Sequence, residues 1–560
     1  MKRLLITFAS LATAALVACG PGTPREPQFP AIDGQAILNH INVLASDEYE
    51  GRAPGTKGEE LTVAYLTEQF QKLGLQPGNT DGTYTQKVPL VGITANPDTS
   101  LDFRKGRQRL SLKFKDDVVA WTKRVTEEVT VENSGVVFVG YGVVAPEYQW
   151  DDYKGLDVAG KTLIMLVNDP PVPDSIDPSV LDKTTFGGPA MTYYGRWTYK
   201  YEIGAEKGAA AVILVHETGP AGYPFSVVQG KTAENFDLVP PDKNMGRAAI
   251  EGWITLDKAK ELFTLAGQDF DTLKAAALSR DFTPVDFGVT ASMKLQNTLR
   301  TIDSQNVVAK LEGSDPVLKD EYLVLTSHWD HFGVGAPDAT GDTIYNGAYD
   351  NASGVAALLE IARAFAGVQP PSKRSIVFLA VTAEEQGLLG SGYYAAVPIY
   401  PLDKTLACIN MDGMNMYGPT SDVIVVGLGA SDLDDIATAI ATAQGRTITP
   451  DQEPEKGFYY RSDHFPFAKA GVPALNASSG NKYVGKPEDY GTKLREEYTA
   501  KHYHQPSDEL QPDWVTTGTV EEADFYLKVA YKVAQGDKYP EWKPGNEFKA
   551  TREAMLKKPQ

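Results

Sequence analysis

Residues 323–354, LVLTSHWDHFGVGAPDATGDTIYNGAYDNASG, decide how this chain is interpreted. The apolar run at 322–325 has the length and composition of a buried strand, and Ser-His-Trp-Asp-His follows it at 327–331. After a loop rich in Gly, Asp and Thr, Asp350 leads into residues 355–365, whose apolar residues recur at helical spacing. Imidazoles and carboxylates are ligands that zinc accepts, and the carboxyl ends of strands face the crevice of an open α/β sheet. The segment therefore predicts a metal site.

The second half of the chain alternates apolar strands with helices. The strands are NVVAKLEG, YLVLTSH, SIVFLAVTA, TLACIN and DVIVVGLG, all after residue 305. This alternation predicts an α/β fold with a mostly parallel sheet covered by helices on both faces. Two further strands also end in acids, at Glu384-Glu385 and at Asp412. Five of the seven histidines, at 328, 331, 464, 502 and 504, fall in this half, which also favours a metal.

Composition restricts the class of protein. A chain of 560 residues with 42% hydrophobic residues is globular and too long for one ordinary core, so more than one domain is expected. The net charge of -20 and the lack of a basic stripe argue against a nucleic-acid partner. Cys408 lies in an apolar run and is interpreted as a core residue. The other cysteine of the chain, Cys19, lies in the N-terminal segment described next and leaves Cys408 without a disulfide partner.

The N-terminus has the layout of a secretory signal. Lys2 and Arg3 precede an apolar segment at 4–17, which is too short to span a membrane as a mature helix. The ending Leu16-Val17-Ala18-Cys19-Gly20 resembles a bacterial lipobox, which implies lipidation of Cys19; the alternative is an ordinary cleaved signal. We expect a signal peptide at 1–19, a linker at 20–33 and an exported lipoprotein, anchored in a membrane at the periplasm or cell surface.

A change of sequence pattern divides the remaining chain into two domains. Residues 126–290 contain short β runs separated by Gly, Pro and Asp turns, and they predict an inserted β-rich domain. His216 is interpreted as a structural residue, so this domain carries no predicted chemistry. Residues 34–125 and 291–540 form the α/β domain, and residues 541–560 read as a weakly packed tail.

An ordered set of motifs resembles peptidase family M28, a family of zinc peptidases. The set is His328-Trp329-Asp330, GAYDNASG at 347–354, Glu384-Glu385, Asn410-Met411-Asp412, Ser462-Asp463-His464 and Tyr503-His504. The segment DEYEGRAPGTKGEE at 47–60 also resembles the N-terminal part of that family. The inserted domain is similar to the protease-associated domain that members often carry.

The resemblance implies a centre with two zinc ions per chain. One ion is bound by His328 and Asp412, the other by Glu385 and His504, and Asp350 bridges them. Each ion then keeps an open position, as in catalytic zinc sites. The resemblance also implies a strained, even cis, peptide bond after Asp350. His504 is preferred to His502 because residues 503–508, YHQPSD, match the last family motif.

Other roles follow from the same resemblance. Glu384 is the general base that takes a proton from the water between the metals, so that a metal-bridged hydroxide attacks the substrate. Tyr459, with Tyr460 as its rival, is expected to hydrogen-bond the oxyanion. Asp330 is expected to orient His328 and Asp508 to orient His504.

The predicted function is that of an exported zinc exopeptidase acting on peptides, an aminopeptidase by family frequency. Carboxypeptidases and dipeptidases of the same family remain alternatives. A glutaminyl cyclase-like acyltransferase would use a single zinc, and a receptor-like protein would have lost its metals. The full set of five ligands favours the hydrolase over both.

Overall fold

The computed structural model describes residues 26–97, 100–230 and 234–557. The predicted signal segment, Cys19 and the linker up to residue 25 lie outside these residues. Within the described part of the chain, no helix is both long and apolar enough to cross a membrane.

The α/β domain is built on one mixed sheet with a parallel centre. In spatial order its strands are β20 (Thr447–Pro450), β19 (Asp422–Val426), β21 (Ala474–Ser479), β18 (Thr405–Asn410), β14 (Tyr322–His328), β17 (Ser375–Val381), β13 (Val285–Leu311) and β2 (Thr85–Pro97), with β1 (Gln76–Pro77) beside the end of β13. Strands β17, β14, β18 and β21 are mutually parallel. Strand β13 runs antiparallel to β17, and β19 runs antiparallel to β21 but parallel to β20. The predicted fold class is confirmed.

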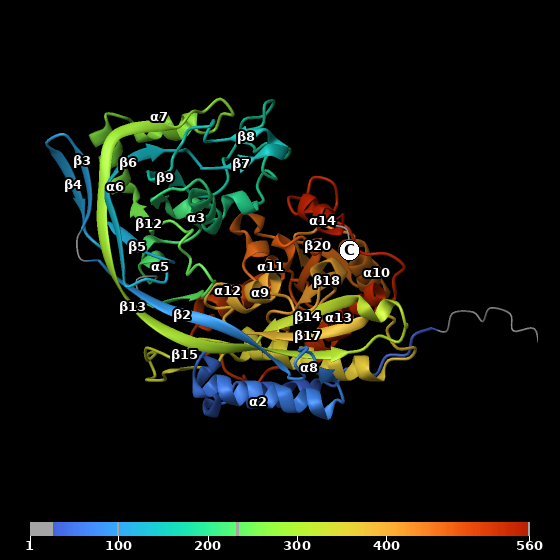
Figure 1. Cartoon of the computed structure of the whole chain (residues 1–560). Coiled ribbons are helices and arrows are strands. Elements are labelled where there is room, and N and C mark those ends of the chain that lie inside the picture. Colours follow the sequence, from blue (N-terminus) through green and yellow to red (C-terminus); the bar gives the residue numbers. More distant parts are fainter. Residues whose placement is uncertain (1–25, 98–99, 231–233, 558–560) are drawn as a thin grey trace, which may run out of the picture.

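Helices cover both faces of this sheet (Figure 1). On the face away from the second lobe lie α1 (Gly34–Leu44), α2 (Lys57–Lys72), α8 (Ser353–Gly367) and α13 (Thr517–Gln535), and on the opposite face lie α9 (Leu389–Ala396) and α11 (His464–Lys469). The buried strand β14 shows why both faces are needed. Leu323 and Leu325 pack in the core that contains α8, whereas Val324 points into the core of the opposite face. A uniformly apolar strand therefore requires two helical layers.

A second lobe stands beside the α/β domain. Its elements are β3 (Leu101–Lys105), β4 (Gln108–Leu112), β5 (Val118–Trp121), β6 (Glu128–Phe138), β9 (Thr162–Leu166), β10 (Ala211–His216), β12 (Ile250–Thr255), α3 (Trp197–Glu206), α6 (Leu256–Ala266) and α7 (Phe270–Ala276). It thus takes in strands that precede residue 126, and it holds helices that the β-rich interpretation did not include, among them α6 and α7. The long strands β2 and β13 run through both lobes as one antiparallel ribbon (Figure 1).

The C-terminal segment is packed, in contrast to the weakly packed tail expected from its composition. Trp542 is 2% exposed and donates from its indole nitrogen to the Gly471 carbonyl at 2.8 Å. Arg552, in α14 (Lys549–Leu556), donates to the carbonyl oxygens of Leu402 and Thr405. The expectation was wrong because a few large side chains, here Trp542 and Arg552, are enough to pack a segment, even where Lys, Pro and Glu dominate its composition.

Candidate metal centre

Three neighbouring strands deliver ligand-type side chains to one edge of the sheet. His328 ends β14, where it is in register with Val381 at the end of β17. Glu384 and Glu385 follow β17, and Asp412 follows β18. Parallel strands end at the same edge, so these four side chains converge.

The fifth member, Asp350, lies in the turn η5 (Ala348–Ala352), which leads into α8. Asn351 fixes this turn from behind, because its amide donates to Ser327 Oγ at 3.0 Å and to the Met411 carbonyl at 3.1 Å. Gly347 has a φ of 56°, and a Cβ there would lie 2.3 Å from the Asp350 carbonyl oxygen. The bond between Asp350 and Asn351 is cis, as expected. The φ and the close carbonyl at Gly347 leave little room for any other residue at that position.

The imidazoles of His328 and His504 face the two oxygens of Asp350 from opposite sides. His328 Nε2 lies 3.2 Å from Asp350 Oδ1 and 3.3 Å from Asp412 Oδ1. His504 Nε2 lies 3.4 Å from Asp350 Oδ2 and 3.2 Å from Glu385 Oε2. Two ligand atoms bound at about 2.0–2.1 Å to one tetrahedral zinc are roughly 3.3–3.4 Å apart. All four separations therefore fit two ions that share Asp350.

His331 is the competing histidine of this cluster. Its potential ligand atoms lie within 4.8 Å of those of Asp350 and Glu385, so it meets a loose criterion for a metal ligand. Its Nδ1 is only 2.7 Å from Glu385 Oε1, however, which is a hydrogen-bond distance. His504 in addition has a φ of 58°, an unfavourable conformation for a non-glycine residue. The geometry favours His504 as the ligand and His331 as the residue that holds Glu385.

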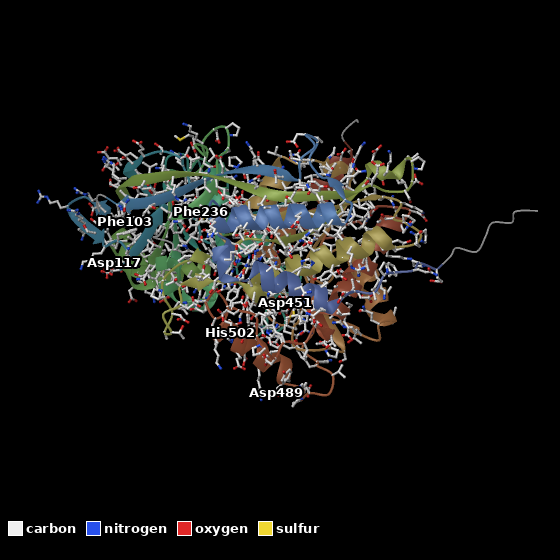
Figure 2. All side chains as sticks on the ribbon, turned by 90° about the horizontal axis from the view of Figure 1, so that it is seen from below. Phe103, Asp117, Phe236, Asp451, Asp489 and His502 are labelled. Atoms are coloured by element: carbon white, nitrogen blue, oxygen red, sulfur yellow. The ribbon has the colours of Figure 1, made fainter. Side chains whose placement is uncertain are left out.

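The two remaining histidines of this half stay outside the cluster. His502 follows α12 (Tyr490–Lys501), and its Nδ1 lies 2.9 Å from the Ser507 carbonyl. In Figure 2, Asp489, which precedes α12, marks the outer edge of the molecule, with His502 closer to its body. His464 is fully buried, and neither of its ring nitrogens has a hydrogen-bond partner in the described residues.

The acids change the pKa values of both facing histidines. Burial would lower the pKa of His328, but Glu384, Asp350 and Asp412 reverse this and hold it well above its usual value. Burial likewise opposes the charged form of His504, and hydrogen bonds to Asp350 and Glu385 raise its pKa to about 10. Both imidazoles thus sit where a positive charge is strongly favoured.

The pKa values of the acids shift in different directions. Burial disfavours the charged form of Asp350, but His328 and His504 lower its pKa well below the usual value. Glu384 is the exception, because burial and the neighbouring acids Glu385 and Asp412 raise its pKa well above that of an ordinary glutamate, although His328 opposes them. A buried carboxyl with a raised pKa is suited to proton transfer.

Asp330 and Asp508 support the cluster, but not entirely as expected. His328 Nδ1 lies 3.1 Å from the backbone carbonyl of Asp330, and the Asp330 carboxylate instead accepts from the Glu384 amide at 3.0 Å. Asp508 accepts from the backbone amides of Tyr349 and Asp350, both at 3.0 Å. The expectation that Asp508 orients His504 was wrong, because the chain folds its carboxylate under the η5 turn. Asp508 therefore positions the bridging acid.

Two supporting residues were not assigned from the sequence. Ser462 Oγ donates to Asp412 Oδ2 at 2.5 Å. Arg52 is buried and donates from its guanidinium to the carbonyl oxygens of Trp329, Asn346 and Gly347. Burial lowers the pKa of Arg52 to about 10, against the opposing effect of nearby acids. The segment at 47–60 was recognised by its motif, but no local pattern indicates that one arginine reaches across the fold to the η5 loop.

Tyr459 is not among the residues that line the pocket of Asp350 and Asp412. It lines a separate cavity with Met191 and Glu547, and its buried hydroxyl has no hydrogen-bond partner in the described residues. The turn η8 (Phe458–Tyr460) directs its ring against His464, with centroids 4.8 Å apart. Its rival Tyr460 donates to Glu547 at 2.9 Å. Tyr503 instead lines the pocket that Asp350 and Asp412 share, so the structure does not support the oxyanion role expected of Tyr459.

Imidazoles and carboxylates at ligand spacing, on the carboxyl edge of a parallel sheet, form a cluster that could hold a metal ion. Comparison with known proteins agrees, because residues 306–527 match the model of peptidase family M28. This segment of the chain therefore resembles an M28 peptidase domain.

The relatives it resembles are zinc metalloproteases and aminopeptidases. A probable zinc metalloprotease of Pyrenophora teres f. teres (strain 0-1) is 42% identical over 112 residues, which cover 20% of this chain and 23% of that protein. In the matches to this and four other probable zinc metalloproteases, the chain spans less than a quarter of the length of each of those proteins. The probable leucine aminopeptidase 2 of Aspergillus oryzae is 25% identical over 526 residues, covering 91% of this chain and 86% of that protein.

Among solved structures, an aminopeptidase from Aneurinibacillus sp. strain AM-1 aligns with a TM-score of 0.47 at 19% identity. The alignment covers 92% of this chain and 95% of that chain.

Proposed function

We propose that this protein is an exported dinuclear zinc exopeptidase that removes N-terminal residues from peptides. The observation that carries the proposal is the set of four nitrogen–oxygen separations of 3.2–3.4 Å around Asp350. The M28 match and the aminopeptidase relative that covers most of the chain support the choice of reaction.

The donor set fits zinc. Imidazole nitrogen and carboxylate oxygen are its usual ligands, and each proposed ion receives one histidine, one acid and a share of Asp350. Asp350, Glu384, Glu385 and Asp412 would repel one another if they were buried together without cations. His328 and Asp412 would hold one ion, and Glu385 and His504 the other. When bound there, zinc would polarise the peptide carbonyl and lower the pKa of a water molecule.

The residues of the chain supply the proton transfer. Glu384 is held by its backbone amide on Asp330, next to the ligand Glu385. It would receive a proton from the attacking water on a carboxylate oxygen and pass it to the nitrogen of the leaving amine. Ala383, just before it, has a φ of 54°, which is strained for a residue with a side chain and fixes the direction in which Glu384 leaves the strand.

Export, the lipid anchor and the nature of the insert complete the proposal. Cys19 would carry the lipid and hold the enzyme at the periplasmic face of a membrane or on the cell surface. Residues 126–290 would form a protease-associated-like domain that restricts access to the centre. Fractionation of cells tests the anchor: wild-type protein is expected with membranes, and Cys19→Ala protein in the soluble fraction.

A substrate panel tests the reaction. The zinc-loaded enzyme is offered an aminoacyl chromogenic amide, the same substrate with a blocked amino group, and a peptide with N-terminal Gln. Hydrolysis of the free aminoacyl substrate, without cleavage of the blocked one, is expected. Cyclisation of the Gln peptide with one zinc per chain would instead support a glutaminyl cyclase-like acyltransferase.

A further inference from the structure

The cavity that Tyr459 lines adjoins the metal pocket, which is the pocket of Asp350 and Asp412. It has a volume of about 130 Å³. Three residues line both spaces: Val426, Asp451 and Phe458. Pockets for drug-sized ligands usually measure about 300–1,000 Å³. A cavity of this size therefore suits a single side chain of a substrate that is held in the metal pocket.

Three distant segments form the walls of this cavity. Met191 belongs to the second lobe, Gly427 follows β19, and Phe548 belongs to the C-terminal segment. The amide of Met191 donates to the Pro454 carbonyl at 3.0 Å, which ties the second lobe to the α/β domain at this point. The cavity is therefore held open by packed parts of the fold.

Glu547 is an acid in this lining that has no cation. Its carboxylate accepts a hydrogen bond from the Tyr460 hydroxyl at 2.9 Å. It forms no ion pair within residues 26–97, 100–230 and 234–557, and neither Lys nor Arg lines the cavity. Burial raises the pKa of Glu547, and the hydrogen bond from Tyr460 opposes that shift. A positively charged ligand would favour the ionised form of this carboxyl.

The Tyr459 hydroxyl is a second polar group of the lining. It is buried, and no hydrogen-bond partner for it occurs in the described part of the chain. An oxygen of this kind can accept a hydrogen bond from a ligand. A ligand that donates would therefore meet two acceptors in the cavity, this hydroxyl and the carboxylate of Glu547.

Aromatic rings supply much of the remaining surface. Phe458, Tyr459, Tyr460 and Phe548 all line the cavity. The ring of Tyr459 lies edge-on to Tyr460 and nearly parallel to Phe548, with centroids 5.4 and 6.5 Å away. The face of an aromatic ring attracts a cation that lies within about 6 Å of its centroid. Rings of this kind beside one acid form an environment that favours an ammonium or guanidinium group.

We propose that this cavity binds the cationic end of a lysine or arginine side chain, with Glu547 and the Tyr459 hydroxyl as its hydrogen-bond partners. Ammonium and guanidinium groups donate and do not accept, which matches these two oxygens. The preferred substrates are then peptides that begin with a basic residue, whose side chain extends past Asp451 into the cavity. This inference rests on the proposed exopeptidase function and specifies its substrates.

A matched pair of substrates tests the subsite. The zinc-loaded enzyme is given the chromogenic anilides of lysine and of norleucine, which has the same carbon chain without the ammonium. Wild-type kcat/KM is expected to be at least about tenfold higher for lysine, since a hydrogen-bonded charge is worth about ten- to a hundredfold. Glu547→Gln, which can still accept from Tyr460, should reduce this ratio to about two.

Two further variants separate the subsite from general effects of mutation. Tyr459→Phe removes only a hydroxyl and should lower the ratio by about three- to tenfold. Glu541→Gln changes an exposed acid of the same C-terminal segment, so it is the control and should keep the wild-type ratio. A lysine-to-norleucine ratio that Glu547→Gln leaves at its wild-type value would overturn the proposal.

Binding separates failure of the subsite from failure of the proposed function. Affinities of Glu384→Gln protein for lysinamide and norleucinamide are measured by calorimetry, where no turnover is needed. A preference for lysinamide that is lost on adding Glu547→Gln supports the subsite even if wild-type enzyme cleaves neither anilide. Equal affinity and equal kcat/KM for the two ligands, with cleavage intact, would overturn the subsite and leave the exopeptidase proposal standing.

Discussion

The two halves of the proposed metal centre, one around His328 and the other around His504, are built in different ways. His328 ends a central strand, its side chain is 1% exposed, and its second ring nitrogen contacts the Asp330 carbonyl. His504 follows α12 on a loop, its side chain is 32% exposed, and it is held mainly by stacking on Tyr503, with centroids 3.7 Å apart. One half is thus fixed by the sheet, whereas the other is completed by a surface segment. We therefore expect the His504 half to bind its ion more weakly.

The largest effect is expected at the residue that belongs to neither half. Glu384→Gln removes the proton acceptor but no ligand, so turnover should fall by about 10²–10⁴-fold with both metals retained. Its neighbour is the matched control, because Glu385→Gln removes a ligand of the His504 half and should lose metal. Turnover and zinc content are measured on the same samples. Equal zinc loss in the two variants would contradict the separate roles.

Metal removal separates the two halves directly. With increasing chelator, the zinc on the His504 side should leave first, and activity should fall with that first ion. Zinc content and activity are followed together by elemental analysis and a chromogenic substrate. Simultaneous loss of both ions at every chelator concentration would show that the halves are equivalent.

A smaller effect is expected at the residue that aligns the shared acid. Asp508→Asn weakens two hydrogen bonds to the turn that carries Asp350, so zinc affinity should fall by about 10–100-fold at both halves. His502→Ala, which changes a histidine close in sequence but outside the cluster, is the control. An effect confined to the His504 side would mean that Asp508 acts on His504 after all.

The smallest effect concerns a buried imidazole without acids. Burial lowers the pKa of His464 to about 3, in contrast to the acid-paired His504. The unfolded chain then takes up this proton first on acidification, so the contribution of His464 to stability is present above its unfolded pKa and is lost as the pH falls toward 3. Between pH 7 and pH 5 the loss is about 2 kcal/mol.

His464→Phe should remove this part of the pH dependence, since the ring makes no hydrogen bond in the described residues. Free energies of unfolding of both proteins are compared at the two pH values in the presence of chelator. Parallel pH profiles for variant and wild type would show that His464 is not the group responsible.

The sheet-borne part of the candidate metal centre was predictable from the sequence. A buried apolar strand ending in His328, and two more ending in Glu385 and Asp412, predict one sheet edge, because alternation with helices predicts parallel pairing and parallel strands end at the same edge. The motif set added the bridging role of Asp350 and the ligand role of His504. In the structure both side chains lie beside those of His328, Glu385 and Asp412, in agreement with these roles.

The supporting residues were less predictable. Asp508 and Arg52 act through backbone groups of the η5 loop, and such contacts depend on how distant segments cross, which no local pattern encodes. Tyr459 was misplaced because adjacent residues in a tight turn point in different directions, so its motif position did not determine which cavity its ring enters. The packing of the C-terminal segment was not predicted, because its Lys, Pro and Glu content suggested weak packing. Composition does not show that a few large residues, such as Trp542 and Arg552, anchor it.

The most direct test of the account is the zinc content of three proteins purified in parallel. We predict two zinc ions per chain in wild type, one in His504→Ala and two in His331→Ala. His504 Nε2 lies 3.4 Å from Asp350 Oδ2 and 3.2 Å from Glu385 Oε2, whereas His331 Nδ1 lies 2.7 Å from Glu385 Oε1, a hydrogen-bond distance. Two ions in His504→Ala together with one in His331→Ala would contradict this prediction.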